Sequence, residues 1–276
     1  MALWPSVTPT TIDKTAKEGQ MSTLANARDV LRLLASHPRD LTVTDVAAGL
    51  DAPKSSVSRT LGMMAEFGFL ERDPQTLAYR PGPLILEAAS HVRGSTDVVA
   101  LLNEALVRLV DTTGYTGYLN LLEGGETLVI RMRQGRAGRL QAYTPEGTRG
   151  TAYASSSGRA ILARLTDEDV SGLIGTRLEP AGSAPRTLPE LLERLAQVRA
   201  EGWSLSRGES VHGVAGVASA VVDPTSGRPY GIGIGLPVQD LETTDPELLG
   251  EAVRDAAHSV GRKVADPFWL GFPTTN

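Results

Sequence analysis

Two short helical patterns joined by a tight turn constrain the fold of this 276-residue chain more than any other feature. The first begins at Thr42, which forms a capping-box pattern with Asp45 three residues later, and it ends at Gly49. The second begins at Pro53, a residue suited to the first position of a helix, and runs to Phe67. Two such helices in succession predict a helix-turn-helix motif.

The segments on either side of this motif complete a larger unit. Apolar residues between Leu24 and Leu34 recur at i, i+3, i+4 and i+7, which predicts a supporting helix that Pro38 ends. After the motif, residues 70–73 and 77–80 are typical of two short strands around a Pro-containing turn. A supporting helix before the motif and a hairpin after it predict a winged helix-turn-helix.

The second helix of the motif offers a positive, hydroxyl-rich face. Between Ala52 and Ala65 it carries Lys54 and Arg59 and no acidic residue, whereas the net charge of the whole chain is −5. Small polar residues at the start of a helix, together with Arg or Lys, suit the major groove of double-stranded DNA. The predicted DNA contacts from this helix and the wing are Lys54, Ser55, Ser56, Ser58, Arg59, Arg72 and Gln75. The alternatives are a solvated helix face that contacts another protein and, for the wing, a plain polar turn.

The rest of the chain alternates helical and strand patterns, and Gly124-Gly125 is a strong hairpin signal. Runs of antiparallel hairpins flanked by helices predict an α+β fold. Strands are expected over 115–122, 126–133, 139–143, 203–207, 214–222 and 230–236, and helices over 96–113, 157–165, 188–201 and 246–263. The expected organisation is a mobile polar arm over 1–20, the winged helix-turn-helix over 21–82, a linker helix over 83–97, a larger antiparallel-sheet domain over 98–268 and a tail over 269–276.

Composition removes several classes of function. The chain has no cysteine, which excludes disulfides and thiolate chemistry, and its four histidines are far apart without metal-ligand spacing. No apolar run of about 18 residues and no signal peptide occur, so we expect a cytoplasmic protein that contacts no membrane. A Gly-x-Ser-x-Gly elbow, a P-loop and a dinucleotide fingerprint are also missing. We therefore expect neither an enzyme nor a bound metal or cofactor.

Four segments resemble one family of bacterial regulators, the IclR family. Val43–Ala65 resembles the family's winged helix, and Tyr79–Gly82 resembles the element that follows its wing. In the C-terminal part, Gly150–Ala163 and Glu209–Asp223 are similar to the family's two signature segments. The resemblance spans about Met21 to Ala265.

The resemblance implies a winged helix-turn-helix, a linker helix and a GAF-like effector domain. It implies a homodimer or a tetramer formed by a pair of dimers on operator DNA. It also implies repression or activation of catabolic genes in response to a small carboxylic or aromatic acid, and of the two we expect repression. The sequence departs from the family at Arg159, where a lysine is usual, at Gly216, where cysteine or serine is frequent, and at Ala218-Ser219-Ala220, which lacks the usual proline.

An effector site is expected around the serine run that precedes the helix at 157–165. Serine hydroxyls and free N–H groups at a helix N-terminus bind anions, although ordinary N-capping uses the same groups. Leu119 and Met132, on the expected hairpin strands, would line an apolar wall or simply pack in the core. The resemblance adds Tyr143, Tyr153, Ala154, Gly216 and Ala218. The candidate effector contacts are Leu119, Met132, Tyr143, Tyr153, Ala154, Ser156, Ser157, Gly158, Gly216 and Ala218. Several tyrosines in a chain with only 5% aromatic residues hint at an aromatic ligand. A protein-binding module without a ligand is the alternative.

Overall fold

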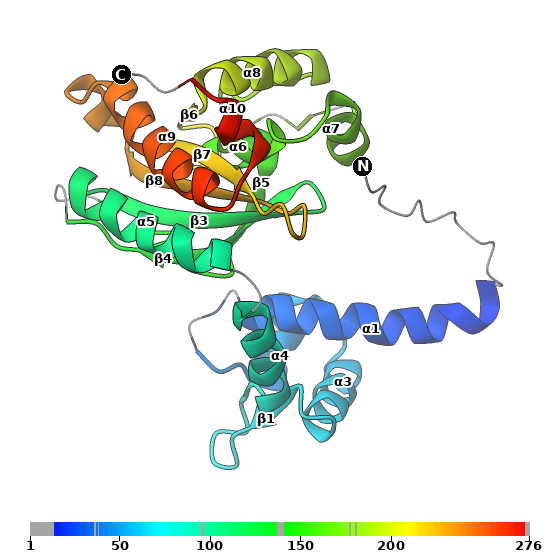
Figure 1. The fold of residues 1–276 in the computed structure, drawn as a ribbon. Helices are drawn as coiled ribbons and strands as arrows, with labels where there is room; N and C mark the ends of the chain where they lie inside the picture. Colours follow the sequence, from blue (N-terminus) through cyan, green and yellow to red (C-terminus); the bar gives the residue numbers. More distant parts are fainter. Residues whose placement is uncertain are drawn as a thin grey trace. The chain divides into compact units, whose positions relative to one another are not determined.

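The computed structural model describes residues 14–35, 37, 39–94, 97–136, 141–176, 178–179 and 181–273. The chain divides into two compact units, one that ends at Gly94 and one that begins at Ser95, and each is described by itself (Figure 1). No described helix has the length and apolar character needed to cross a membrane. The combination of helices with antiparallel sheets confirms the predicted α+β class.

The N-terminal unit consists of helices packed against a small hairpin (Figure 1). Its single core joins Val30 of the first helix, Val46 and Leu61 of the helix-turn-helix, and Tyr79 of the hairpin. The two strands are antiparallel, with Leu70 opposite Pro81. This is the predicted winged helix-turn-helix. Its elements are α1 (Lys14–Ala35), α2 (Val43–Gly49), α3 (Lys54–Glu66), β1 (Leu70–Arg72), β2 (Tyr79–Pro81) and α4 (Pro83–Gly94).

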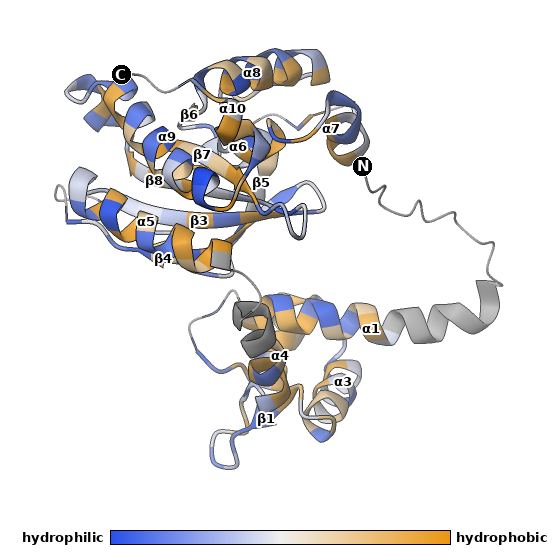
Figure 2. Cartoon of the chain, viewed as in Figure 1, coloured by the Kyte–Doolittle hydropathy of each residue, from blue (hydrophilic) through white to orange (hydrophobic). Residues whose placement is uncertain are grey.

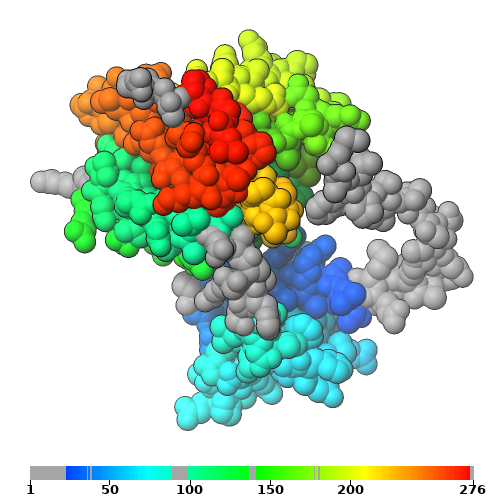
Figure 3. Space-filling view, in the orientation of Figure 1, coloured from blue at the N-terminus to red at the C-terminus, as the bar shows by residue number. Residues whose placement is uncertain are grey.

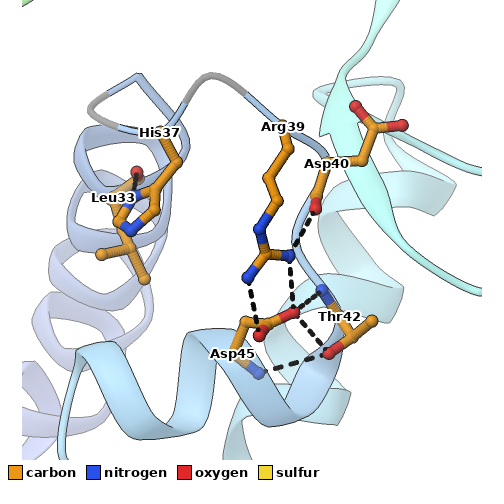
Figure 4. Close-up of polar contacts among 6 residues, drawn as sticks. All are labelled: Leu33, His37, Arg39, Asp40, Thr42 and Asp45. Carbon is orange, nitrogen blue, oxygen red and sulfur yellow. Dashed lines mark hydrogen bonds and ion pairs between the residues drawn. The ribbon is translucent and has the colours of Figure 1, made fainter.

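The predicted capping box fixes the start of α2 (Figure 4). Thr42 Oγ1 accepts a hydrogen bond from the Asp45 backbone N–H at 3.3 Å, and the Thr42 N–H donates to Asp45 Oδ2 at 2.8 Å. The Arg39 guanidinium donates to both oxygens of the same carboxylate, at 3.2 and 3.1 Å. Arg39 first, and then Thr42, hold the pKa of Asp45 well below its usual range. Just before this, the Nδ1 of His37 lies 2.9 Å from the Leu33 carbonyl oxygen.

Two predictions for this unit need correction. α1 begins at Lys14, so residues 14–20, which the sequence placed in a mobile arm, are helical; residues 1–13 lie outside the described residues. Pro53 is the N-cap of α3 and not its first helical residue. Its φ of −59° and ψ of 132° are those of an extended residue that leads into the helix.

The C-terminal unit is built on an antiparallel sheet with strand order β5-β4-β3-β8-β7-β6 among the described residues. Its strands are β3 (Thr116–Glu123), β4 (Glu126–Arg133), β5 (Arg149–Thr151), β6 (Ser204–Arg207), β7 (Val214–Val222) and β8 (Pro229–Pro237). Its helices are α5 (Asp97–Thr113), α6 (Ser156–Leu162), α7 (Asp167–Ile174), α8 (Leu188–Glu201), α9 (Pro246–Lys263) and α10 (Pro267–Gly271). Short 3-10 turns cover Ala152–Ala154 and Val238–Glu242.

Helices cover both faces of this sheet. On one face α5 and α9 pack together over a large core that includes Leu106, Ile232 and Val253. Both helices alternate hydrophobic and hydrophilic residues along their length (Figure 2), and α9 and α10 form part of the outer surface (Figure 3). On the other face α6 packs on β7, and a second core that includes Leu162 and Leu191 joins it to α7 and α8.

The predicted strand over 139–143 is wrong in the part that is described. Residues 141–144 have no regular structure, and residues 139 and 140 lie outside the described residues. The outer edge of β4 pairs instead with β5, and just before it the Val129 N–H donates to the Thr148 carbonyl at 2.9 Å. The Ala142 carbonyl accepts from Tyr118 Oη at 2.9 Å, so side chains rather than a strand ladder hold this segment.

The short helix α10, which sequence analysis did not predict, is held by one buried carboxylate. Asp266 is fully buried and accepts hydrogen bonds from Arg164 at 2.5 Å, from the Val222 N–H at 2.8 Å and from the Phe268 N–H at 3.1 Å. Trp269 Nε1 donates to the Ala220 carbonyl at 2.9 Å. These contacts tie the C-terminal segment to the turn that follows α6 and to β7.

The capping box gives the first testable prediction. Replacing Thr42 with alanine removes the side-chain acceptor at the start of α2, and such losses cost about 1 kcal/mol. We expect the backbone amides of α2 to exchange about fivefold faster in hydrogen–deuterium exchange, while Thr42→Ser keeps the hydroxyl and the wild-type rate. Equal exchange in the alanine and serine variants would show that the hydroxyl does not stabilise α2.

Candidate nucleic-acid interface and ligand cavity

One face of α3 is exposed and carries cations without ion pairs. Lys54, Ser55, Ser56, Ser58 and Arg59 are all exposed, as the helical periodicity predicts. The opposite face is buried through Val57, Thr60, Leu61 and Met64. Neither Lys54 nor Arg59 forms a salt bridge with any residue in the described part of the chain. The positive charge of this face is therefore available to a ligand outside the unit.

The wing presents its two predicted contact residues differently. Asp73 Oδ1 accepts hydrogen bonds from the Gln75 and Thr76 N–H groups, at 2.8 and 2.7 Å, so it stabilises the turn and leaves the Gln75 side chain exposed at the tip. The Arg72 guanidinium lies 5.6 Å from the centre of the Tyr79 ring, in the strand pair next to the turn, and the residue is exposed.

A neighbouring wing residue, Arg80, differs from Arg72 in having carboxylate partners. Its guanidinium is bound to the Glu71 carboxylate at 3.0 Å, and the Asp40 carboxylate lies 4.0 Å away. Its charge is therefore largely compensated. Among the described arginines of the hairpin, Arg72 is the one without a carboxylate partner.

The C-terminal unit contains a cavity of about 170 Å³ on the α6 face of the sheet. Its walls come from β3, β4, β5 and the segment before it, the start of α6, β6 and the loop after it, and the paired ends of β7 and β8. The lining residues are Tyr118, Asn120, Thr127, Val129, Ala142, Thr144, Thr148, Arg149, Gly150, Ser155, Ser156, Ser157, Ser206, Ser210, Val211, Val214, Ala215, Gly216, Ile234 and Gly235. Hydroxyl groups are the commonest polar groups of this lining.

All three serines at the start of α6 line the cavity, and Ser155 also caps the helix. Ser155 Oγ accepts the Gly158 N–H at 3.0 Å, so Ser155 is the N-cap of α6. Ser157 Oγ accepts from Asn120 Nδ2 of β3 at 3.0 Å. Ser156 is almost completely buried and lines the cavity. Ser155 therefore serves ordinary N-capping as well as lining the cavity, and anion binding by the serine run stays a prediction.

Arg149 is the one charged residue of the lining, and it is already paired. Its guanidinium contacts the Glu123 carboxylate and lies 3.4 Å from the Glu126 carboxylate, in strands β3 and β4. Its side chain is 23% exposed. The cavity is therefore lined mainly by neutral hydrogen-bonding groups, with one compensated cation at its edge.

A buried ion pair holds the cavity wall together. Arg159 of α6 donates to Glu209 at 2.5 Å, to the Tyr153 carbonyl at 2.9 Å and to the Leu205 carbonyl at 2.6 Å. Arg194 of α8 lies 3.4 Å from the other oxygen of Glu209. Burial lowers the pKa of Arg159, and the Glu209 carboxylate opposes this shift. The pair fixes α6 to β6 and to the loop that contributes Ser210 and Val211.

The structure brings together three of the predicted effector contacts. Ser156, Ser157 and Gly216 line the cavity. Gly158 is not among the lining residues; a Cβ there would lie 2.1 Å from the Ala152 carbonyl oxygen, so the glycine lets α6 pack closely against Ala152. Ala218 packs under α6 against Ala160 and Ile161.

The other predicted contacts lie elsewhere. Leu119 is in the core on the α5 and α9 face of the sheet. Tyr153 and Ala154 are in the second core, where Tyr153 Oη donates to the Glu179 carbonyl at 2.8 Å. Tyr143 is 66% exposed. Met132 is half-buried on β4 outside the lining.

Several lining residues were not predicted from the sequence. Tyr118 and Asn120 follow the two-residue alternation of β3, so they share a face that excludes Leu119. That alternation would have identified them once the strand was placed between two helical layers. On β8, the same two-residue alternation places Gly235 in the cavity lining. Ser206 lies on β6 opposite Gly216, so its place depends on the pairing of β6 with β7. Ser210 gives no signal of this kind, because it lies in the loop after β6.

An exposed cationic helix in a winged helix-turn-helix, followed by a second domain with a cavity, is typical of DNA-binding transcriptional regulators. Residues 23–74 match the IclR helix-turn-helix domain, and residues 90–262 match the family described as bacterial transcriptional regulator IclR C-terminal. The chain therefore belongs to the IclR family.

Relatives along most of the chain agree with this assignment. The chain is 30% identical to the HTH-type transcriptional regulator BhcR of Paracoccus denitrificans, over 88% of this chain and 87% of that protein. It is 27% identical to the HTH-type transcriptional repressor AllR of Salmonella typhimurium, over 91% and 93%. An IclR homologue from Microbacterium hydrocarbonoxydans, solved in complex with 4-hydroxybenzoate, has the same fold, with a TM-score of 0.72 and 21% identity over 88% and 99%.

The buried ion pair leads to the second prediction. Glu209→Gln leaves the Arg159 guanidinium buried without a carboxylate, and breaking such a pair costs about 3–5 kcal/mol. Urea unfolding followed by tryptophan fluorescence measures this loss, because Trp203 and Trp269 both lie in the C-terminal unit. The control Glu251→Gln removes an exposed partner of Arg254 and should change stability by less than about 1 kcal/mol. Similar losses in the two variants would contradict a special role for Glu209.

Proposed function

We propose that this protein is a ligand-responsive repressor of catabolic genes that binds operator DNA through α3 and the wing and senses a small organic acid in the cavity. One observation carries the proposal: the exposed face of α3 holds two cations that no carboxylate in the described part of the unit neutralises. Elsewhere in the same unit, Arg39 and Arg80 are paired with carboxylates. Unpaired cations on a helix that begins with small hydroxyl residues match the requirements of the major groove.

The predicted roles of the DNA contacts follow from their positions. Ser55, Ser56 and Ser58 are short enough for the helix to approach the base edges closely, and Arg59 is long enough to reach a guanine or a phosphate. Lys54, at the first position of α3, suits a phosphate oxygen. In the wing, Arg72 and Gln75 would contact the backbone or the minor groove.

The cavity supports the sensing half of the proposal. Hydroxyls of Ser156 and Ser206 and the edge cation Arg149 offer donors for a carboxylate, while Tyr118 and Val129 offer an apolar wall. The 4-hydroxybenzoate complex of the Microbacterium homologue supports an organic acid as the ligand class. Repression is supported by the repressor AllR among the relatives.

Ligand and operator would act on each other through one equilibrium. If an acid weakens operator binding by some factor, the operator weakens acid binding by the same factor. One recognition helix reads only a few base pairs, so we expect a homodimer or a pair of dimers on successive half-sites. Such a protein works where the chromosome lies, in the bacterial cytoplasm.

The third prediction tests the recognition helix. Arg59→Ala should weaken binding to the operator by about 1–3 kcal/mol, because a contact with a base or a phosphate is lost. Fluorescence anisotropy with the DNA upstream of the protein's own gene, over a salt series and with unrelated competitor DNA, measures the change. Lys263→Ala, at the end of α9, removes one positive charge elsewhere and serves as the charge-matched control. Operator binding by Arg59→Ala equal to that of the control would refute the assignment of α3.

The fourth prediction tests the cavity as the sensor. Binding to the folded state alone stabilises a protein by about 2.7 kcal/mol at a ligand concentration of 100 Kd, so an acid that binds should raise the Tm. We would screen glyoxylate, pyruvate, benzoate and 4-hydroxybenzoate by thermal shift and then by release of operator DNA. Ser156→Ala combined with Ser206→Ala should reduce the shift, whereas Ser171→Ala in α7, outside the lining, should not. A shift that the double variant retains would place the acid at another site.

A further inference from the structure

One leucine of the wing is both strained and exposed. Leu77 has a φ of 58°, in the left-handed region that residues with a large side chain rarely adopt. It lies in the turn between β1 and β2 and is 50% exposed. Leu77 therefore destabilises the folded unit twice, through backbone strain and through apolar surface that stays in water.

The hydrogen bonds of the turn impose this conformation. The Leu77 N–H donates to the Asp73 carbonyl at 2.9 Å, and the Asp73 N–H donates to the Ala78 carbonyl at 2.8 Å. These bonds close a hairpin loop with one left-handed residue just before the second strand, a position at which glycine is usual because it has no Cβ. Glycine would relieve the strain here, so folding alone does not account for a leucine.

Two other non-glycine residues of the described chain have such a φ, and both differ from Leu77. Asp51, between α2 and α3, has the short polar side chain that tolerates this conformation. Ala265 follows α9, where the Asp266 N–H donates to the Gly261 carbonyl at 2.8 Å, and a left-handed residue is ordinary at such a helix end. Among the described residues, Leu77 is thus the one large apolar side chain in this region.

The surroundings of this leucine suit a polyanion. Gln75 is exposed in the same turn, and Arg72, in the adjoining strand, has no carboxylate partner in the described part of the hairpin. Both acidic residues of the hairpin are engaged, because Asp73 Oδ1 accepts two N–H groups of the turn and Glu71 is bound to Arg80. The turn projects beyond its two strands as a loop below the β1 label (Figure 1).

The minor groove of DNA offers an apolar side chain a matching surface. Deoxyribose rings form its walls, and proteins that bind there frequently insert leucine or similar side chains. In the proposed complex α3 occupies the major groove, and the wing follows α3 after a short connection. The turn can therefore reach the backbone and the minor groove next to the bases that α3 contacts.

We propose that Leu77 positions the wing on DNA: its side chain enters the minor groove beside the half-site that α3 reads and packs against the deoxyribose rings. The inference rests on the proposed function and adds an apolar contact to the polar ones of Arg72 and Gln75. The rigid turn already holds the side chain in place, so little ordering remains to be done on binding. The contact carries no charge, so salt does not screen it.

Substitutions of Leu77 separate the side chain from the backbone conformation. Asparagine and glycine both tolerate the left-handed region, so Leu77→Asn and Leu77→Gly should fold with a Tm no lower than that of wild type. Both should weaken operator binding about tenfold, because burial of the exposed half of the side chain is lost. Leu77→Met keeps an apolar side chain of similar size and should bind within about threefold of wild type.

Fluorescence anisotropy of the full-length protein with the DNA upstream of its own gene, over a salt series, measures this. The dependence of affinity on salt should be unchanged in Leu77→Asn, whereas Arg72→Ala should reduce it by removing a cation. Hydroxyl-radical cleavage reports the exposure of minor-groove deoxyribose. We expect protected sugars beside the half-site that become exposed in Leu77→Asn. Leu248→Asn replaces a leucine of 62% exposure in α9 and should match wild type in both assays.

The outcomes separate this inference from the proposed function. Wild-type affinity and footprint in folded Leu77→Asn would overturn the inference and leave the role of α3 in place. Weaker binding with an altered assembly in sedimentation velocity without DNA would also overturn it, because Leu77 would then contact a second copy. Should Leu77→Asn not fold, Leu77→Gly carries the test. If wild type binds neither the upstream DNA nor any sequence selected from a random pool, the proposed function itself fails.

Discussion

The alternation of side chains along β8 is the constraint on which the C-terminal unit depends. β8 lies between β3 and β7 and is covered on both faces. Its even-numbered residues from Tyr230 to Leu236 enter the core beneath α5 and α9. Glycines occupy the positions between them, so the other face presents almost bare backbone. A shift by one residue would place every large side chain of the strand against α6.

This alternation both positions α6 and leaves the cavity. Near Gly231 the bare face lets Ile161 of α6 approach the sheet closely, and near Gly235 the same face borders the cavity. Arg159 then anchors α6 through Glu209 to the loop that lines the cavity. Because a buried guanidinium needs partners on every side, one ion pair determines where several wall segments lie.

The sequence predicts the elements whose signals are local. Thr42 with Asp45, Gly124-Gly125 and the α8 boundary at Gly202 each carry their own hydrogen-bond or backbone requirement, and each is found as predicted. The helix α10 was missed because it is only five residues long and depends on Asp266, whose partners come from the turn after α6 and from β7.

The candidate site was predictable only in part for the same reason. Ser156 and Ser157 lie together in the sequence, and a local pattern identifies them. Leu119 and Tyr118 are neighbours in the sequence but lie on opposite faces of the sheet, so choosing between them requires knowing which helices cover which face. Without that knowledge, the apolar Leu119 was predicted to line the apolar wall.

The two candidate binding surfaces use charge in opposite ways. On α3, Lys54 and Arg59 have no carboxylate partner in the described part of the unit, so their field extends to a polyanion and salt screens it. In the cavity, Arg149 is held by Glu123 and Glu126, and the remaining polar groups are neutral. Recognition of the proposed acid there would depend on shape and on hydrogen bonds at fixed positions, which salt affects little. An acidic chain can therefore bind DNA locally, because its carboxylates compensate cations elsewhere and leave those of one helix free.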